Sequence, residues 1–193
     1  MKTFELADLP HLAPDIARRC FAIEPIFYSL FSPNHEENLA GIERLLLDPR
    51  TDLGCNRVIL EDGKLCGFFS FYDIRKAMSV QISTLKALRK TPSRRTDTRI
   101  RVKEFNAGVP PVREPSLYLS KIFVTEQFRG RGLARTMLAE LYGLARTEDL
   151  HGVSLHVRAD NAPALALYAS EGFTVIDKSA SYLVLLRREQ TGA

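Results

Sequence analysis

Apolar positions recur along the chain with two periods, one typical of strands and one of helices. Short apolar or alternating segments predict strands at 3–6, 57–61, 65–74, 117–124, 153–158, 173–177 and 182–187. Apolar residues three or four apart predict helices at 9–22, 36–47, 131–147 and 162–170, with a shorter one at 80–88. Asp62-Gly63 is a hairpin signal between two of these strands. The order of elements predicts a mixed sheet flanked by helices.

Residues 75–113, between two predicted strands, do not fit this compact plan. They hold eleven Lys and Arg against two acidic residues, a net charge of +9, whereas the whole chain is +4. A connection of about 40 residues is long for a compact domain. We expect 91–102 to be flexible and the segment to be a solvated loop. Its charge leaves open an acidic substrate, a phosphate contact or nucleic-acid attraction, although Phe105, its one aromatic residue, argues against base stacking.

Composition favours one globular domain, residues 1–193, with a basic insertion at about 75–115. The chain is 45% apolar, yet no apolar run approaches the ~20 residues of a membrane span. The N-terminus lacks the basic start and apolar stretch of a secretion signal. Cys20, Cys55 and Cys66 are odd in number and scattered, which favours reduced thiols over disulfides or a metal site. We therefore expect a cytoplasmic protein without a metal or a membrane partner.

A glycine-rich turn joins the strand at 117–124 to the helix that follows it. Its pattern is Arg129-x-x-Gly132-x-Ala134. Glycines let the backbone approach a ligand closely, and the first N–H groups of a helix have no internal partner. We therefore expect this turn to bind a phosphate group. A Walker loop is excluded because Gly-Lys-Ser/Thr is absent, and a dinucleotide fingerprint because Arg135 stands where its third glycine belongs.

A second motif lies downstream, in the order Asn161, Ala164, Leu167-Tyr168, Gly172-Phe173. Asn161 predicts a helix start and Gly172 the stop of that helix. The two motifs in this order resemble the pyrophosphate loop and the closing motif of the Gcn5-related N-acetyltransferase (GNAT) superfamily. The resemblance is strong over 117–177 and extends to the N-terminal part only in outline.

The resemblance implies a mixed α/β (α+β) fold, with a central, mostly antiparallel sheet flanked by helices and splayed between its fourth and fifth strands. It implies acetyl-CoA as co-substrate. The pantetheine arm would lie beside Ile122, Phe123 and Val124, one of which would hold the thioester oxygen through its N–H. Asn161 would cap its helix and reach the pantetheine. The pyrophosphate would bind the amides of Arg129, Gly130, Arg131, Gly132, Leu133 and Ala134.

Two side chains are candidates for proton transfer. Tyr168, a phenol of pKa ~10 beside a leaving thiolate of pKa ~8.5, is the candidate acid, or else a core tyrosine. Residues 155–161 resemble the matching stretch of bacterial ribosomal-protein N-terminal alanine acetyltransferases, in which a glutamate base occupies the position of His156. A histidine of pKa ~6.5 suits that role through a water, or else fills a half-buried strand. The strand at 117–124 has no acid, and Glu126 is a weaker candidate.

The sequence thus predicts an N-acetyltransferase in which a primary amine attacks acetyl-CoA directly. A small-molecule amine is favoured over a protein N-terminus or lysine. A CoA-binding regulatory module without catalysis is the alternative of another class, and a nucleic-acid-associated protein using the basic segment is a third. Nucleic acid is not expected as a partner, and a homodimer is left open.

Overall fold

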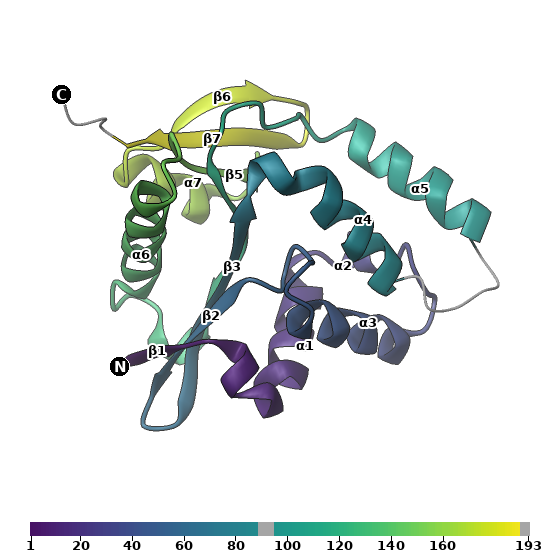
Figure 1. Ribbon diagram of the computed structural model, residues 1–193, viewed down its shortest axis with the longest axis horizontal. Coiled ribbons are helices and arrows are strands. Elements are labelled where there is room, and N and C mark those ends of the chain that lie inside the picture. Colours follow the sequence, from purple (N-terminus) through teal and green to yellow (C-terminus); the bar gives the residue numbers. More distant parts are fainter. Residues whose placement is uncertain (89–94, 190–193) are drawn as a thin grey trace.

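The computed structural model describes residues 1–88 and 95–189, and the side chains in these ranges except those of 95–99 and 101. Its strands form one seven-stranded sheet in the order β1-β2-β3-β4-β5-β7-β6 (Figure 1). Neighbouring strands are antiparallel except for the parallel pair β4 and β5. The strands are β1 (Lys2–Phe4), β2 (Asn56–Glu61), β3 (Lys64–Asp73), β4 (Leu117–Val124), β5 (Gly152–Arg158), β6 (Thr174–Lys178) and β7 (Tyr182–Arg188). The predicted mixed, mostly antiparallel sheet is confirmed.

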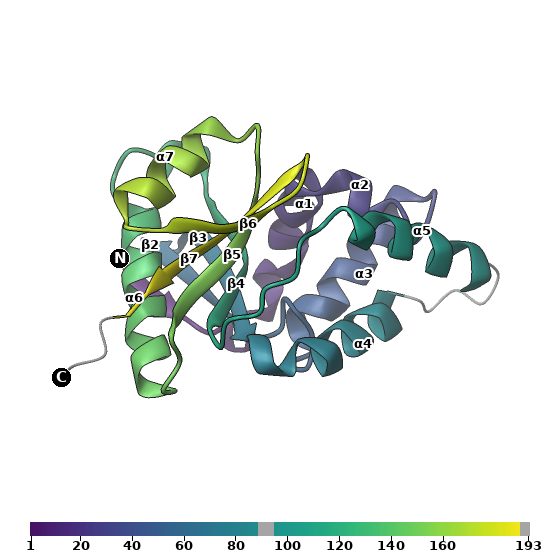
Figure 2. The ribbon, with the colours of Figure 1, turned by 90° about the horizontal axis from the view of Figure 1, so that it is seen from above.

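Helices cover both faces of this sheet (Figure 2). On one face lie α6 (Leu133–Thr147) and α7 (Ala162–Ser170). On the other lie α1 (Ala13–Ile23), α2 (Pro25–Tyr28), α3 (His35–Leu47), α4 (Ala77–Leu88) and α5 (Arg95–Ala107). Each layer has its own apolar core. Because side chains alternate along a strand, consecutive residues belong to different cores: Phe69 packs toward α6, whereas Phe68 packs toward α1 and α3. The predicted helix at 80–88 begins earlier, at Ala77, and the short α2 was not predicted.

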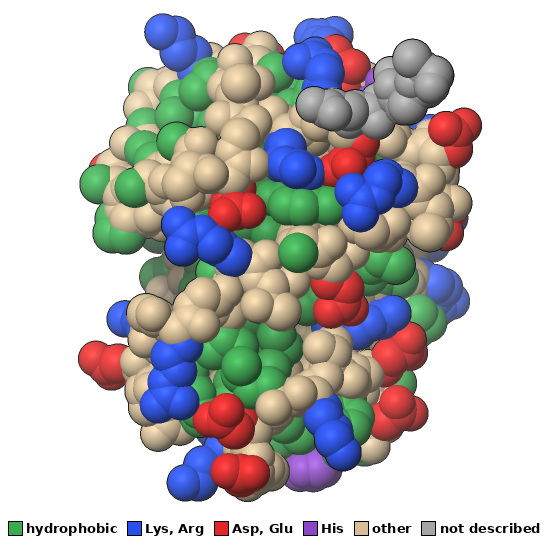
Figure 3. All heavy atoms as spheres, turned by 90° about the vertical axis from the view of Figure 1, so that its left-hand side faces the viewer, with side chains coloured by type: hydrophobic (Ala, Val, Ile, Leu, Met, Phe, Trp, Pro, Cys, Tyr) green, Lys and Arg blue, Asp and Glu red, His purple; other side chains and the backbone are tan. Residues whose placement is uncertain are grey.

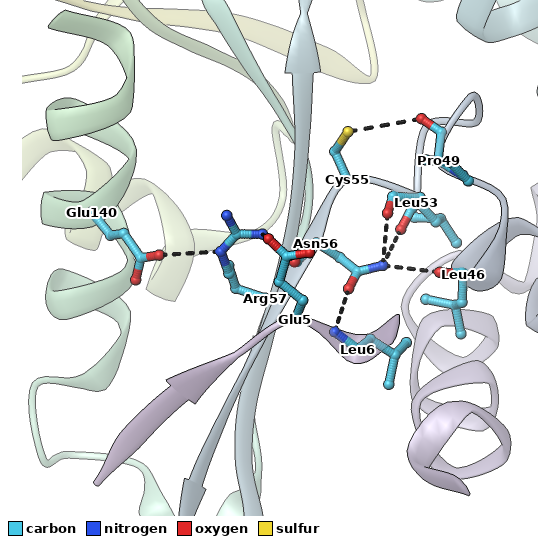
Figure 4. Close-up of polar contacts among 10 residues, drawn as sticks. Glu5, Leu6, Leu46, Pro49, Leu53, Cys55, Asn56, Arg57 and Glu140 are labelled. Atoms are coloured by element: carbon cyan, nitrogen blue, oxygen red, sulfur yellow. Dashed lines mark hydrogen bonds and ion pairs between the residues drawn. The ribbon is translucent and has the colours of Figure 1, made fainter. Parts of the chain in front are cut away.

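Two adjacent residues of β2 anchor the sheet to both layers (Figure 4). The buried amide of Asn56 donates to the carbonyls of Leu46, at 3.0 Å, and Leu53, at 2.7 Å, and it accepts from the N–H of Leu6 at 3.3 Å. Arg57 points the other way and pairs with Glu140 of α6 at 3.6 Å. Asn56 therefore fixes the loop between α3 and β2.

The sheet opens between β4 and β5. Their parallel pairing ends at Leu119 and Leu155, although β4 continues to Val124 and β5 to Arg158. On the other side of β4, Lys121 lies opposite Ser70 and Leu119 opposite Phe71, so Ser120 forms a bulge. The expected splay between the fourth and fifth strands is confirmed, and it leaves one edge of β4 without a partner strand.

The basic segment is folded where it was expected to be flexible. That expectation is wrong for 95–102, which lie in α5; residues 91–94 are outside the described part. Val102, on α5, and Leu88, at the end of α4, are buried in the core that faces α1 and α3. Apolar contacts between distant segments thus outweigh the charge that dominates the local sequence.

Within 1–88 and 95–189, no helix combines the length and apolar character needed to cross a bilayer.

Candidate active site

The glycine turn presents a row of free N–H groups. Gly130 and Gly132 have φ of 75° and 78°, a conformation that strains residues with a side chain. The backbone N–H groups of residues 130–135 donate to no acceptor in the described part of the chain, and the first bond of α6 runs from Thr136 to the carbonyl of Gly132. The positive end of the α6 dipole lies at the same place. The turn therefore suits an anionic phosphate ligand.

The arginines near this turn are engaged to different degrees. Arg131 pairs with Glu61 at 3.3 Å and lies over the Phe128 ring, 5.0 Å from its centroid. Arg135 pairs with Glu171, at the end of α7, at 2.9 Å. Arg129 makes only a long contact, 3.5 Å, to the Val124 carbonyl. On this side of the molecule positive and negative side chains alternate, so the helix terminus and its amides, more than a basic patch, would attract a phosphate (Figure 3).

The open edge of β4 presents two of the three residues expected to contact pantetheine. The N–H of Thr125 donates to the carbonyl of Cys66 on β3 at 2.8 Å. Because backbone groups alternate in direction along an antiparallel strand, Phe123 also faces β3, whereas Ile122 and Val124 face β5. The pairing with β5 has already ended there. Ile122 and Val124 thus present free N–H groups to the opening, and Phe123 does not.

His156 lies on β5 just beyond the end of the parallel pairing, with both ring nitrogens occupied. Nε2 is 2.6 Å from the Pro110 carbonyl, and Nδ1 is 2.9 Å from the Tyr118 hydroxyl. A carbonyl only accepts, so Nε2 carries the proton and Nδ1 of the neutral ring accepts from Tyr118. Burial lowers the pKa of His156 more than the Pro110 carbonyl and Glu24 raise it. The neutral ring is therefore the stable form, and Tyr118 lies on the path to its basic nitrogen.

Tyr168 is buried on the α7 side of the sheet, with its ring 5.4 Å from that of Phe173. Its hydroxyl makes no hydrogen bond with any described residue. Burial raises its pKa to about 12, so the phenol keeps its proton. Asn161 caps α7 by accepting from the N–H of Ala164 at 3.3 Å, so the expected cap is confirmed.

A cavity of about 460 Å³ lies on the other face of the sheet, beside the opening. Its sheet side is formed by β3, β4 and β5, where Tyr118 and His156 line it. Its outer walls come from the basic segment: α4, α5 and residues 109–112. This volume is within the range of about 300–1,000 Å³ that is typical of small-molecule sites. The described part of the insertion therefore supplies walls of a pocket.

Three charged side chains, Glu24, Asp52 and Lys121, line the cavity. Lys121, on β4, pairs with Glu24 from the end of α1, and the two side chains are 12% and 26% exposed. The Lys121 ammonium lowers the pKa of Glu24. Asp52, from the loop before β2, accepts from Thr84 Oγ1 at 2.9 Å and Ser120 Oγ at 3.4 Å. Burial raises the pKa of Asp52, against the opposing effect of Lys121.

Sequence reasoning did not identify Tyr118, Asp52, Glu24 or the Lys121 pair as site residues. The strand period places Tyr118 on the face opposite to Leu117 and Leu119, which pack toward α6, so this signal was present in the sequence. Lys121 reaches the same face as Tyr118 only because of the bulge at Ser120, which the sequence did not indicate. Asp52 lies within the loop between α3 and β2, and Glu24 lies between α1 and α2, so only the tertiary fold brings them to β4. No cluster of three or more His, Cys, Asp or Glu able to hold a metal occurs in the described part of the chain.

Two solved structures share this fold over nearly their whole length. One is an acetyltransferase, with a TM-score of 0.66 and 20% identity over 93% of this chain and 95% of that one. The other is an N-acetyltransferase from Staphylococcus aureus Mu50, with a TM-score of 0.66 and 19% identity over 92% of this chain and 96% of that one. At these identities the likeness concerns the fold alone.

Sequence comparison gives the family. A stretch of 61 residues is 36% identical to mycothiol acetyltransferase from Corynebacterium kroppenstedtii, over 32% of this chain and 17% of that protein. The chain thus spans a small part of that relative's length. The model of the acetyltransferase (GNAT) family matches residues 22–173, most of the chain. The protein therefore belongs to the GNAT family of acetyltransferases.

Proposed function

We propose that the protein transfers an acetyl group from acetyl-CoA to the primary amine of a small molecule by direct attack. One observation carries this proposal: the cavity is lined by Tyr118 and His156 at the point where β4 and β5 separate. An amine in the cavity would meet a thioester that enters the opening from the α6 side. One sheet contains all seven strands, from β1 near the start of the sequence to β7 near its end. This supports treating the chain as one domain, with the insertion as a wall of its pocket.

Acetyl-CoA fits the residues on the α6 side. The free N–H groups of 130–135 and the helix dipole suit its pyrophosphate. Among the arginines near this turn, Arg129 has the weakest contact to other described residues, so its side chain suits the phosphates best. The unpaired edge of Ile122 and Val124 suits a pantetheine arm that pairs as an extra strand. Either N–H also suits the oxygen of the thioester, where negative charge develops as the amine attacks.

The first step forms the C–N bond and removes one proton from the attacking nitrogen. Tyr118 accepts this proton on its oxygen as its own proton moves to Nδ1 of His156. The resulting imidazolium donates from both nitrogens, to Tyr118 and to the Pro110 carbonyl. His156 is thus proposed as the base acting through Tyr118, in place of the water expected from the sequence.

The second step breaks the C–S bond. Tyr168 gives its proton to the departing sulfur, and burial makes the resulting phenolate short-lived. Solvent then returns a proton to Tyr168 and takes one from His156, which restores both groups. The products are the N-acetylated amine and free coenzyme A, so atoms and charges balance.

The experiment is incubation of the purified protein with acetyl-CoA and a panel of small primary amines. Release of the coenzyme A thiol and the mass of the acetylated amine are followed together. We expect both signals for at least one small amine. A regulatory module would bind acetyl-CoA without thiol release, and a protein acetyltransferase would acetylate only peptides; either result would overturn the proposal.

A further inference from the structure

The charges that face the cavity sum to an acidic surface. Glu24 and Asp52 line it, whereas Lys121 is the single Lys or Arg among the described lining side chains. Lys121 is already paired with Glu24. In the described part of the chain, no Lys or Arg nitrogen lies within 4.0 Å of the Asp52 carboxylate, whose hydrogen-bond donors are neutral hydroxyls. Asp52 is therefore a carboxylate that faces a cavity without a cation of its own.

The basic side chains of the insertion that the structure describes do not change this balance. Lys76, Lys86, Lys103 and Arg113 are exposed and do not line the cavity. The insertion instead turns apolar groups inward, such as Leu85 and Phe105. The positive charge of the insertion left an acidic substrate open. Such a substrate is now disfavoured, because Glu24 and Asp52 would repel its negative charge.

Asp52 is held in position by groups that leave one side of it open to the cavity. Thr84 of α4 joins it twice: its hydroxyl donates to the carboxylate, and it accepts from the Asp52 N–H at 3.1 Å. The neighbouring Thr51 hydroxyl donates to the Leu45 carbonyl at 2.6 Å, and Asn56 anchors the other end of the loop. Such fixed groups bind a ligand without first losing conformational entropy.

Aromatic side chains also line the cavity. Phe105 lies 5.4 Å from Phe27 and 6.5 Å from Tyr182, and Tyr72 lies 5.0 Å from Tyr118, as ring centroids. All of these rings line the cavity. Aromatic faces bury an apolar body and also attract a cation.

We infer that the acceptor is a small diamine-like molecule, with the reacting amine at Tyr118 and a second, cationic nitrogen bound by Asp52 across an apolar body. This inference rests on the proposed function and names the substrate class of the same pocket. Asp52 then acts as a specificity-determining residue. A monoamine of the same length leaves its carboxylate unpaired, and an amino acid brings a second carboxylate toward it.

The test compares kcat/KM for straight-chain diamines, each with the alkylamine and the ω-amino acid of the same length. At the best chain length we expect the diamine to exceed the alkylamine by about 10- to 100-fold, the scale of one charge-assisted hydrogen bond, and the ω-amino acid to be the poorest. In the Asp52→Asn enzyme the ratio of diamine to alkylamine should fall to near one. Asn keeps an oxygen for the Thr84 bond, so the loop is preserved.

Asp48→Asn is the matched control, because Asp48 lies in the same loop but pairs with Arg50 on the surface at 2.8 Å. Its diamine preference should equal that of the wild type. Equal kcat/KM for diamine and alkylamine in the wild type, a preference that survives Asp52→Asn, or a peptide better than every small amine would overturn the inference. Acetylation of alkylamines without preference would leave the proposed function standing, whereas thiol release with no amine at all would refute both.

Discussion

At the scale of single residues, the partners of His156 define what it can do. The Pro110 carbonyl holds the proton on Nε2, and the Tyr118 hydroxyl occupies Nδ1, so no amine reaches the basic nitrogen except through Tyr118. Pro110 follows α5, so a residue of the insertion fixes the tautomer of a residue on β5. The proposed base, its proposed relay and the carbonyl that orients them come from three distant segments, which explains why only His156 was a candidate from the sequence.

His156→Ala should lower the plateau of kcat/KM by about 10²-fold, the low end for one base. The wild-type rate should fall as pH drops through the folded-state pKa of His156, which burial places below its ordinary value of 6.5, because the protonated ring accepts no proton. This fall of kcat/KM at low pH should be absent in His156→Ala. Tyr118→Phe should cost a similar factor, and the double variant little more, since both belong to one relay. If the losses of the two single variants multiply in the double variant, or if the pH profile of His156→Ala equals that of the wild type, the base lies elsewhere.

Tyr168→Phe should lower kcat by roughly 10- to 10³-fold, the scale of one proton transfer or somewhat less, with little change in acetyl-CoA affinity. The ring keeps its packing against Phe173, and only the proton is lost. Tyr142→Phe is the control, because it removes a hydroxyl from another buried tyrosine of the same core, on α6. Equal kcat in Tyr168→Phe and Tyr142→Phe would show that Tyr168 serves packing alone.

At the scale of elements, the turn before α6 tests the phosphate site. Gly132→Glu should weaken acetyl-CoA binding by at least about 10-fold in a calorimetric titration, because it places a carboxylate among the free N–H groups. Gly63→Glu is the control: Gly63 has φ of 74° against 78° at Gly132, and a Cβ meets nothing within 4 Å at either site. Both variants carry the same backbone strain, so equal affinities would mean that the phosphates bind elsewhere.

Elements with strong local signals were predicted with nearly correct bounds. β4 and α7 begin and end at the predicted residues, since an apolar run and an Asn161 cap with Gly172 beyond define them locally. The prediction was wrong at α5, whose Val102 and Phe105 gain their partners only from α2, α4 and the sheet. The same limit applies to the site: the anion-binding turn is local, whereas the acceptor pocket is assembled from remote segments.

At the scale of the whole molecule, the insertion and the GNAT sheet line one cavity. Phe105→Ala should raise KM for the amine by about 10-fold while the Kd for acetyl-CoA stays the same, because the lost wall faces only the acceptor. Ile100→Ala is the control on the same helix, since Ile100 is 54% exposed and does not line the cavity. A parallel loss of acetyl-CoA affinity in Phe105→Ala would show that the insertion serves the other substrate.

Direct transfer is tested by varying acetyl-CoA and the best amine together while following initial rates of thiol release. Two substrates that meet through the opening between β4 and β5 must both be bound before the acetyl group moves. We predict double-reciprocal lines that intersect, as expected for a ternary complex, and no acetylated protein after incubation with acetyl-CoA alone. Parallel lines together with a covalent acetyl-enzyme would contradict direct transfer.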